Sequence, residues 1–286
     1  MSKKIVAVDS QKLEAIQSCM YQYKLKFGSS GSPGSQPLVT PDYFERGGLL
    51  HVMLEAYYKM KRYKSRWQMN KHTHADIIDI CVHTGRTFAG KMNLDIAEIE
   101  TVIGTFMSYT EFWENDGWTN IESVERVGSK LLYDSSDLAI LYEFKIDLIL
   151  SGRQRLPVDH KSSKSRRDPN YLANQFKGYC FGLDCNTLIV NEICFQKTLP
   201  PKDKFRRHTL NYSDALLREW KEQTIWWIVN AISLIEKESY PMNLTSCDKY
   251  SGCIFKELCK SDPEVREYKF KTLFEDRTWD VGLEHL

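Results

Sequence analysis

The chain has 286 residues, of which 42% are hydrophobic and 27% are charged, a composition typical of a soluble globular protein with a sizeable core. Its 39 basic and 38 acidic residues give a net charge of +1, which excludes a strongly basic tail protein and an acidic disordered chain. No apolar run reaches the roughly 18 residues of a membrane-spanning helix, and the N-terminal residues contain no secretory apolar block. We therefore expect a single domain over residues 1–286, located in the cytoplasm and without a membrane partner.

The first part of the sequence predicts mainly helices. Residues 10–27 have an amphipathic pattern, and the Gly-, Ser- and Pro-rich stretch 28–37 predicts a flexible loop. Further helices are predicted at 47–63, 72–90 and 93–115. Their low strand character indicates a helical insertion at about 60–115.

From Trp118 onwards, alternating β-favouring residues predict an antiparallel run of strands. These strands are expected at 118–128, 137–150 and 153–161. A helix over 169–183 should follow, with Asp168 as its N-cap and Pro169 at its first position. Two strands and a long helix are then predicted at 186–196, 205–213 and 213–237. This order indicates an α/β or α+β core over 118–213.

The segment 143–164 contains two acids and a lysine in a predicted hairpin. Asp147 lies on the first strand, and Asp159 and Lys161 share one face of the second. Neighbouring carboxylates repel unless a cation neutralises them, and their oxygens suit Mg²⁺ or Mn²⁺. A lysine beside such an ion can orient a water or neutralise charge on a phosphate. The pattern thus indicates phosphodiester hydrolysis, and the alternative is a surface salt bridge between Asp159 and Lys161.

Two other pairs at helical spacing accompany this hairpin. His51 lies among apolar residues and shares a face with Glu55, as a metal ligand or a satisfied core histidine would. Gln175 and Tyr179 project from one face of the next predicted helix. On their own they would be a half-buried helix face.

Together these motifs resemble the RecB-like branch of the PD-(D/E)XK nuclease superfamily, which carries G-x-x-H, G-x-x-D, (D/E)-x-K and Q-x-x-x-Y in this order. The corresponding segments are Gly48–His51, Phe144–Asp147, Asp159–Lys161 and Gln175–Tyr179. The resemblance extends from about residue 10 to about residue 260, and Phe144 replaces the usual glycine. It implies a restriction-endonuclease-like core, in which helices flank a mixed central sheet, with a helical insertion and a Cys-rich C-terminal segment.

The resemblance also implies a role for each residue. The metal ligands would be His51, Asp147, Asp159 and the backbone carbonyl of His160. The catalytic set would be Lys161 with Asp147, Asp159, Gln175 and Tyr179. Gln175 and Tyr179 would position the nucleic-acid backbone near the ion. Glu125, on the preceding strand, would either add a carboxylate or be an exposed strand residue.

The cysteine run Cys247, Cys253 and Cys259 favours metal binding over disulfides in a reducing compartment. Soft thiolates select an Fe–S cluster or zinc. The chain resembles in particular the iron–sulfur branch of AddB-type and CRISPR-associated exonucleases, which hold a [4Fe–4S] cluster with one N-terminal cysteine and three later ones. This implies Cys19 as the fourth ligand. The family spacing is C-x2-C-x5-C, so Cys247 lies three residues early, and zinc or no metal is the alternative. The remaining cysteines, Cys81, Cys180, Cys185 and Cys194, are expected in the core.

Basic residues follow the presumed site directly. Lys164, Arg166 and Arg167 come just after Lys161 and are candidates for phosphate contacts. A second set of candidates for base stacking or core packing comprises Tyr57, Tyr58, Tyr63 and Trp67.

The resemblance implies a metal-dependent deoxyribonuclease, an exonuclease acting on single-stranded DNA or duplex ends with Mg²⁺ or Mn²⁺. A bacterial, archaeal or virus-infected cell would be its setting, with a helicase, recombination or CRISPR-adaptation protein as candidate partner. The alternatives are a structure-specific or nicking endonuclease, an inactive Fe–S DNA-binding subunit, and a zinc-stabilised interaction protein.

Overall fold

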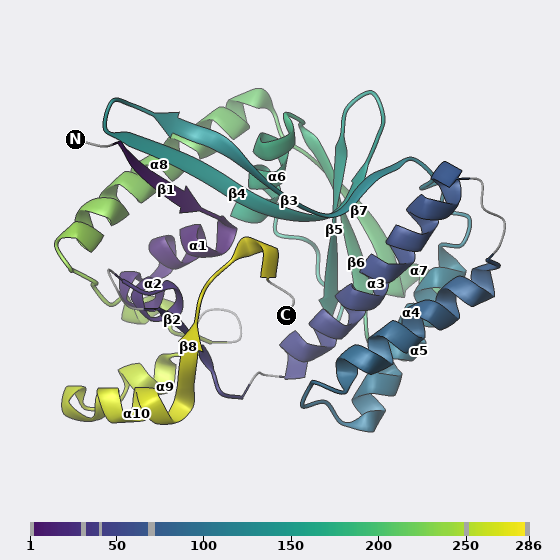
Figure 1. The fold of residues 1–286 in the computed structure, drawn as a ribbon, viewed down its shortest axis with the longest axis horizontal. Helices are drawn as coiled ribbons and strands as arrows, with labels where there is room; N and C mark the ends of the chain where they lie inside the picture. Colours follow the sequence, from purple (N-terminus) through teal and green to yellow (C-terminus); the bar gives the residue numbers. More distant parts are fainter. Residues whose placement is uncertain (1–2, 30–32, 40–41, 68–71, 249–251, 284–286) are drawn as a thin grey trace. The chain divides into compact units, whose positions relative to one another are not determined.

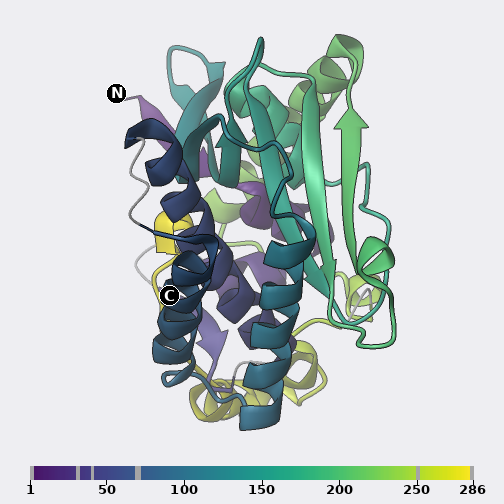
Figure 2. The same cartoon turned by 90° about the vertical axis from the view of Figure 1, so that its right-hand side faces the viewer.

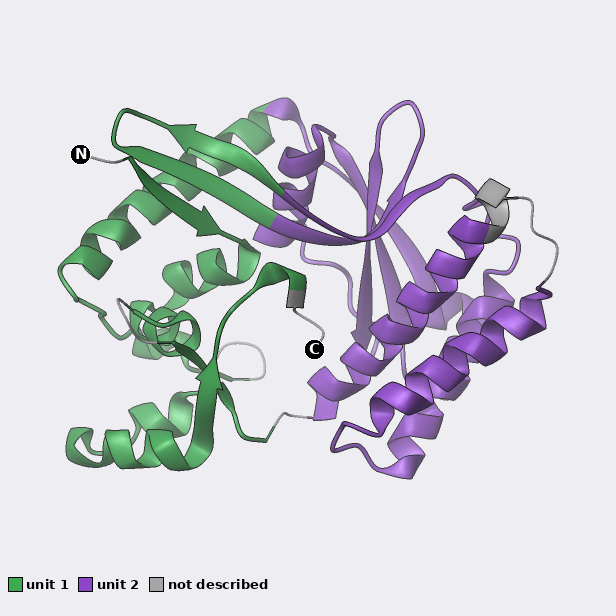
Figure 3. Ribbon diagram, viewed as in Figure 1, with its two compact units in different colours: residues 1–39, 129–143, 215–284 green, residues 40–128, 144–214, 285–286 purple. Residues whose placement is uncertain are grey.

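The computed structural model describes residues 3–29, 33–39, 42–67, 72–248 and 252–283, with only the backbone for 64–67. Contacts divide the chain into two compact units (Figure 3). Unit 1 comprises residues 1–39, 129–143 and 215–284, and unit 2 comprises residues 40–128, 144–214 and 285–286. The long strands β3 (Ile121–Asp134) and β4 (Leu138–Leu150) contribute residues to both units.

A mixed sheet forms the centre of unit 2 (Figure 1). Its strands after β4 are β5 (Leu156–Ser163), β6 (Thr187–Cys194) and β7 (Phe205–Asn211). The β4–β5 and β6–β7 pairs are antiparallel, whereas β5 and β6 are parallel and are joined through a helix. The predicted fold class, a mixed sheet flanked by helices, is therefore confirmed.

Helices cover both faces of this sheet (Figure 2). The predicted insertion forms three of them, α3 (Asp42–Trp67), α4 (His74–Ala89) and α5 (Ile96–Phe112). Tyr58 of α3 stacks on His160 of β5, whereas α6 (Asn174–Leu183) bonds to Lys161 through Gln175. Because successive strand residues point to opposite faces, the insertion covers one face and α6 the other.

The apolar pattern of α3 explains its burial. Leu49, Leu50, Met53 and Leu54 are at most 1% exposed and belong to one core cluster with residues of α4, α5 and the sheet. Their spacing gives a broad apolar stripe, which a helix buries against its neighbours. Because this stripe packs against the core, it sets the rotation of α3 about its axis and with it the direction in which His51 points.

Unit 1 combines short strands with helices. Strand β1 (Lys4–Val8) pairs in parallel with the first residues of β4, and β2 (Gly34–Pro37) pairs with β8 (Phe274–Arg277). Its helices are α1 (Ser10–Ser18), α2 (Met20–Phe27), α8 (Asp214–Glu236), α9 (Lys256–Cys259) and α10 (Arg266–Leu273). Among the helices of the described residues, none combines the length and apolar character needed to cross a bilayer.

Four predicted elements differ in the structure. The strand expected at 118–128 is β3, which begins at Ile121 and continues to Asp134. The helix expected over 10–27 is interrupted at Cys19, whose backbone is extended. The loop expected at 28–37 contains strand β2, while 30–32 lie outside the described residues. The helix expected from Pro169 begins at Asn174 with Ala173 at its N-cap. Asp168 is therefore not a cap, and its carboxylate accepts a hydrogen bond from Arg206 instead.

Candidate active site and metal centre

Asp147 lies on β4 and Asp159 on the adjacent strand β5 of unit 2. Both are at one end of the stretch over which these two strands pair. The β4–β5 register runs from Leu150–Leu156 to Leu148–Val158, so the two aspartates are the next residues on their strands. Both are buried, at 6% and 1% exposure. The predicted hairpin thus brings the two acids together.

The backbone of His160 connects these acids to His51. Its N–H donates to Asp147 Oδ2 at 2.6 Å. His51 of α3 forms a hydrogen bond to the His160 backbone, and only the carbonyl can accept a proton from an imidazole. The His51 ring also approaches the acid, with Nδ1 3.8 Å from Asp147 Oδ2. The carbonyl predicted as a metal ligand therefore faces the imidazole predicted to share that ion.

Glu125 joins this group, and its side chain, which is only 9% exposed, contradicts the expectation of an exposed strand residue. His51, Glu125 and Asp147 each offer a ligand atom, and these atoms lie within 4.8 Å of one another. Glu125 has a φ of 51°, a left-handed conformation that is uncommon for a residue other than glycine. Its carboxylate is 3.1 Å from Lys145 Nζ. Because residue 125 departs from regular strand geometry, alternation along β3 alone does not define the direction of its side chain.

Burial shifts the protonation equilibria at the site. Burial, and then the Asp147 charge, raises the pKa of Glu125 to about 7. Burial and the Asp159 charge raise the pKa of Asp147, and burial lowers the pKa of His51. A neutral imidazole and clustered carboxylates are a donor set for a divalent cation such as Mg²⁺ or Mn²⁺, so this His/Glu/Asp group can bind a metal.

Lys161, Gln175 and Tyr179 form a closed chain of contacts with Asp159. Lys161 Nζ lies 3.0 Å from Asp159 Oδ2 and donates to Gln175 Oε1 at 2.8 Å. Gln175 Nε2 donates to the Tyr179 hydroxyl at 2.8 Å, and that hydroxyl donates to Asp159 Oδ1 at 3.4 Å. The lysine side chain is 45% exposed, so an incoming phosphate can reach it.

The basic residues after Lys161 are exposed, as phosphate contacts require: Lys164, Arg166 and Arg167. Arg166 lies 3.7 Å from Asp203, and the Arg167 N–H donates to buried Glu192. The stacking candidates differ, because Tyr57 and Tyr58 are buried in the core and are not available to unpaired bases. Tyr63 is 50% exposed, and the side chain of Trp67 lies outside the described residues.

Phe144, which replaces the glycine of the family motif, has a defined packing site. Its ring lies against two glycines, Gly128 of β3 and Gly182 of α6. A Cβ on Gly128 would lie 2.7 Å from the ring, and one on Gly182 would overlap it. The bulk gained at residue 144 is therefore accommodated by two neighbours without side chains.

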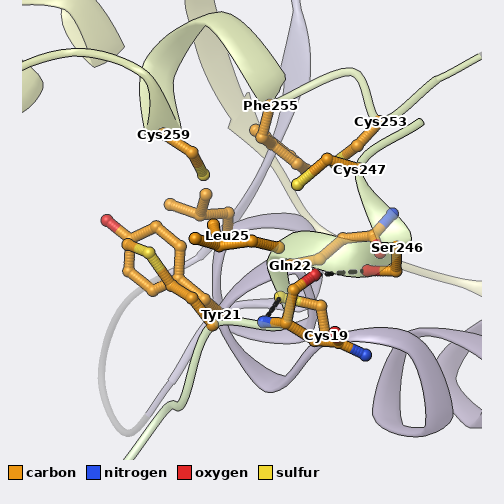
Figure 4. Close-up of a pocket in the computed structure, with 12 residues that line it drawn as sticks. Cys19, Tyr21, Gln22, Leu25, Ser246, Cys247, Cys253, Phe255 and Cys259 are labelled. Carbon is orange, nitrogen blue, oxygen red and sulfur yellow. Dashed lines mark hydrogen bonds between the residues drawn. The ribbon is translucent and has the colours of Figure 1, made fainter.

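The four cysteines predicted as ligands, all in unit 1, line one pocket (Figure 4): Cys19, Cys247, Cys253 and Cys259. The Asn243 N–H donates to Cys19 Sγ at 3.4 Å. Burial raises the pKa of Cys253 and of Cys259. The four other cysteines are buried, as expected for core residues.

No protein-family model and no curated protein matches this chain. Among solved structures, a putative exonuclease from Eubacterium rectale matches with a TM-score of 0.42 and 12% identity, covering 82% of this chain and 88% of that chain. The alkaline exonuclease LHK-Exo from Laribacter hongkongensis has a TM-score of 0.33 and 13% identity, covering 62% and 89%. A phage-related exonuclease from Haemophilus somnus 129PT has a TM-score of 0.30 and 12% identity, covering 65% and 95%. These values are low, so the likeness alone assigns no activity to this chain.

Proposed function

We propose that this protein is a metal-dependent deoxyribonuclease that hydrolyses phosphodiester bonds in unit 2. The proposal is carried by two adjoining groups: His51, Glu125 and Asp147 have ligand atoms within 4.8 Å of one another, and Asp159 with its partner Lys161 lies beside Asp147 on the neighbouring strand without being part of that close group. Such a group is costly to bury when it is charged, and a divalent ion would offset that cost. A surface salt bridge does not explain Asp159, which is 1% exposed.

The proposed mechanism assigns one role to each residue. Asp147, Asp159, His51 and the His160 carbonyl would hold an ion that, when bound, stabilises negative charge on the phosphate. Lys161 would orient the attacking water and neutralise charge on the phosphate. Its position is maintained by Asp159 and Gln175.

The helix α6 would position the substrate. Gln175 and Tyr179 bond to each other and reach Lys161 and Asp159 from the same helix. A phosphate near Lys161 would therefore meet an amide and a hydroxyl in fixed places. Lys164, Arg166 and Arg167 extend positive charge away from the site, so binding should weaken as salt rises.

Cleavage of end-labelled DNA with Mg²⁺ or Mn²⁺ tests this proposal. We expect Lys161→Ala and Asp159→Ala to abolish cleavage. Lys271→Ala, which removes a surface ion pair with Glu267 in unit 1, should cleave like the wild type. Equal cleavage by all four proteins would refute the active-site assignment. The exonuclease assignment rests on the motif resemblance, and cutting of circular DNA would replace it with an endonuclease.

We further propose that the cysteine pocket of unit 1 holds a [4Fe–4S] cluster with a structural role. Tetrahedral zinc with Zn–S bonds near 2.3 Å would place sulfur atoms about 3.8 Å apart. Within the described part of the chain, no three of these cysteines have sulfur atoms within 4.8 Å of one another. The sulfur positions thus do not match a single zinc ion, and the cluster proposal rests on the four cysteines lining one pocket and on the motif resemblance.

An inactive Fe–S DNA-binding subunit, working beside a helicase, recombination or CRISPR-adaptation protein, is the competing proposal. It would share the cysteine pocket and the basic residues but would have no use for the Lys161 contacts. Binding of DNA without cleavage, under conditions where metal binds to unit 2, would favour it.

A further inference from the structure

A row of polar residues crosses the sheet of unit 2 on the face covered by the helical insertion. In the strand register, His160 of β5 pairs with Asn191 of β6, which pairs with Arg207 of β7. The rows on either side are Val158, Ile189 and Thr209, and Ser162, Ile193 and Phe205, so each contains two apolar residues and one small polar residue. Three large polar side chains in one row of a largely apolar, helix-covered face are a local violation of sheet patterning, which is expected at functional sites.

Hydrogen bonds connect the row to two helices. Asn191 Nδ2 lies 2.8 Å from His160 Nδ1 and donates to the Tyr109 hydroxyl at 2.9 Å. An amide nitrogen can only donate, so the His160 ring accepts from Asn191 through Nδ1. The hydroxyls of Tyr109 and Tyr58 are 2.6 Å apart, and the Tyr58 ring stacks on His160 with centroids 5.3 Å apart. The imidazole is thus fixed by α3, α5 and β6 together.

The far end of the row is equally enclosed. The Arg207 guanidinium lies 3.3 Å from the centroid of Trp118 and 3.8 Å from that of Trp113. It donates to Asp116 at 2.7 Å, and Lys61 donates to the same carboxylate at 2.5 Å. Asn191 Oδ1 and Arg207 Nε are buried without a hydrogen-bond partner among the described residues, so the network is costly to bury. The contacts that it does make connect β5, β6 and β7 to helices α3 and α5.

The backbone of His160 is where this network meets the candidate metal centre. Its N–H bonds to Asp147 and its carbonyl faces His51. Hydrogen bonds behind a metal ligand fix the orientation of that ligand, and their removal weakens metal binding. Here the ligand is a main-chain carbonyl, so the side chain of the same residue can set its orientation.

We propose that His160, Asn191 and Tyr109 are positioning residues that fix the peptide of residue 160 and so set the affinity of the metal centre. The inference rests on the proposed metal site. It also gives the helical insertion a role, because Tyr58 of α3 stacks on His160 of strand β5 and Tyr109 of α5 bonds to Asn191 beside it.

Titration of the full-length protein with Mn²⁺, in the absence of DNA, tests this role by calorimetry. Tyr109→Phe removes only the hydroxyl, and Asn191→Leu removes both side-chain hydrogen bonds of the amide. We expect the Mn²⁺ dissociation constant to rise about 10- to 100-fold in each. Tyr57→Phe is the matched control, because it removes the hydroxyl of a buried tyrosine on α3, next to Tyr58 but outside the row, and its constant should equal that of the wild type.

Hydrogen exchange of the His160 amide supplies a readout that does not need the metal. We expect faster exchange in Tyr109→Phe and Asn191→Leu than in Tyr57→Phe.

Unchanged Mn²⁺ affinity and unchanged exchange in Tyr109→Phe would overturn the proposal, even if Asn191→Leu does not fold. A wild type that binds no Mn²⁺ would refute the metal site, and His160 exchange would still decide whether the row positions the peptide. A wild type that binds Mn²⁺ but cleaves no DNA would refute only the nuclease.

Discussion

Glu125 shows most clearly how single residues define the centre in unit 2. It is a half-buried acid with a positive φ, beside His51 and Asp147. Strained backbone at such a place is typical of functional sites, where surrounding structure maintains it. We therefore regard Glu125 as part of the proposed site, although its neighbours in sequence give little indication of that.

The raised pKa of Glu125 predicts how the metal-free protein responds to pH. Its folded pKa of about 7 lies above the ordinary value of 4.5, so the folded state binds more protons than the unfolded state between these values. The contribution of the Glu125 carboxyl to the free energy of unfolding is therefore complete below about pH 4.5. This contribution is lost as the pH rises through about 7. In EDTA, we expect the free energy of unfolding to fall from pH 5 to pH 8.

Urea denaturation of Glu125→Gln checks this prediction. The amide does not titrate, so the decrease between pH 5 and pH 8 should be smaller in the variant than in the wild type. Added Mn²⁺ should also reduce the decrease in the wild type, because the ion stabilises the charged form. An equal pH slope in both proteins would show that Glu125 does not carry the effect.

The sequence could predict the residues whose chemistry depends on order and spacing. The two acids, Lys161, Gln175 and Tyr179 follow motif order, and the structure brings them together. The position of Glu125 in the site could not be predicted as firmly, because the direction of its side chain depends on one backbone torsion, the positive φ of residue 125. The packing of Phe144 depends on glycines 16 residues before it and 38 residues after it, so only the folded sheet reveals it.

At the scale of elements, the contact between β4 and α6 positions the helix that carries Gln175 and Tyr179. The Phe144 ring occupies the space beside Gly128 and Gly182. Because cores are close-packed, α6 can approach the sheet only while residue 182 has no side chain. The distance between α6 and the catalytic strand therefore depends on this packing.

We expect Gly182→Ala to destabilise the protein by about 1–3 kcal/mol, since an added methyl group forces strain in a packed core. The matched control is Gly104→Ala in helix α5, where a Cβ would meet no atom within 4 Å and alanine should stabilise by roughly 0.5–1 kcal/mol. Phe144→Leu combined with Gly182→Ala should recover part of the loss. Urea denaturation measures all three, and a neutral Gly182→Ala would contradict the packing account.

The predicted elements were most accurate where periodicity was long. The three insertion helices and the strands from β4 to β7 were expected close to their observed bounds. The start of α6 was wrong because Asp168 bonds to Arg206 of a distant strand, a tertiary contact that local capping rules do not include. The break at Cys19 was missed for a similar reason, since the Cys19 sulfur bonds to Pro241 and Asn243, which are distant in the sequence.

At the scale of the whole molecule, the chain separates a candidate catalytic unit from a candidate cluster-binding unit. The cysteine pocket joins the N-terminal helices of unit 1 to the segment after α8. Metal-ligand energy of this kind contributes to folding. Loss of the cluster should therefore destabilise unit 1.

We expect Cys19→Ala to lose iron and visible absorbance and to melt at a lower temperature than the wild type. Cys194→Ala, which removes a buried thiol of unit 2, should keep its iron. Iron analysis and thermal denaturation measure both effects. If Cys19→Ala retains its iron, its colour and its melting temperature, the structural role of the pocket is wrong.

The most direct measurement of the proposed centre is anomalous X-ray diffraction from crystals grown with Mn²⁺. We predict a manganese peak enclosed by His51, Asp147, Asp159 and the carbonyl of His160, and the loss of that peak in Asp159→Ala. Manganese bound only elsewhere on the wild-type protein, with these side chains turned away from one another, would contradict the metal-dependent nuclease.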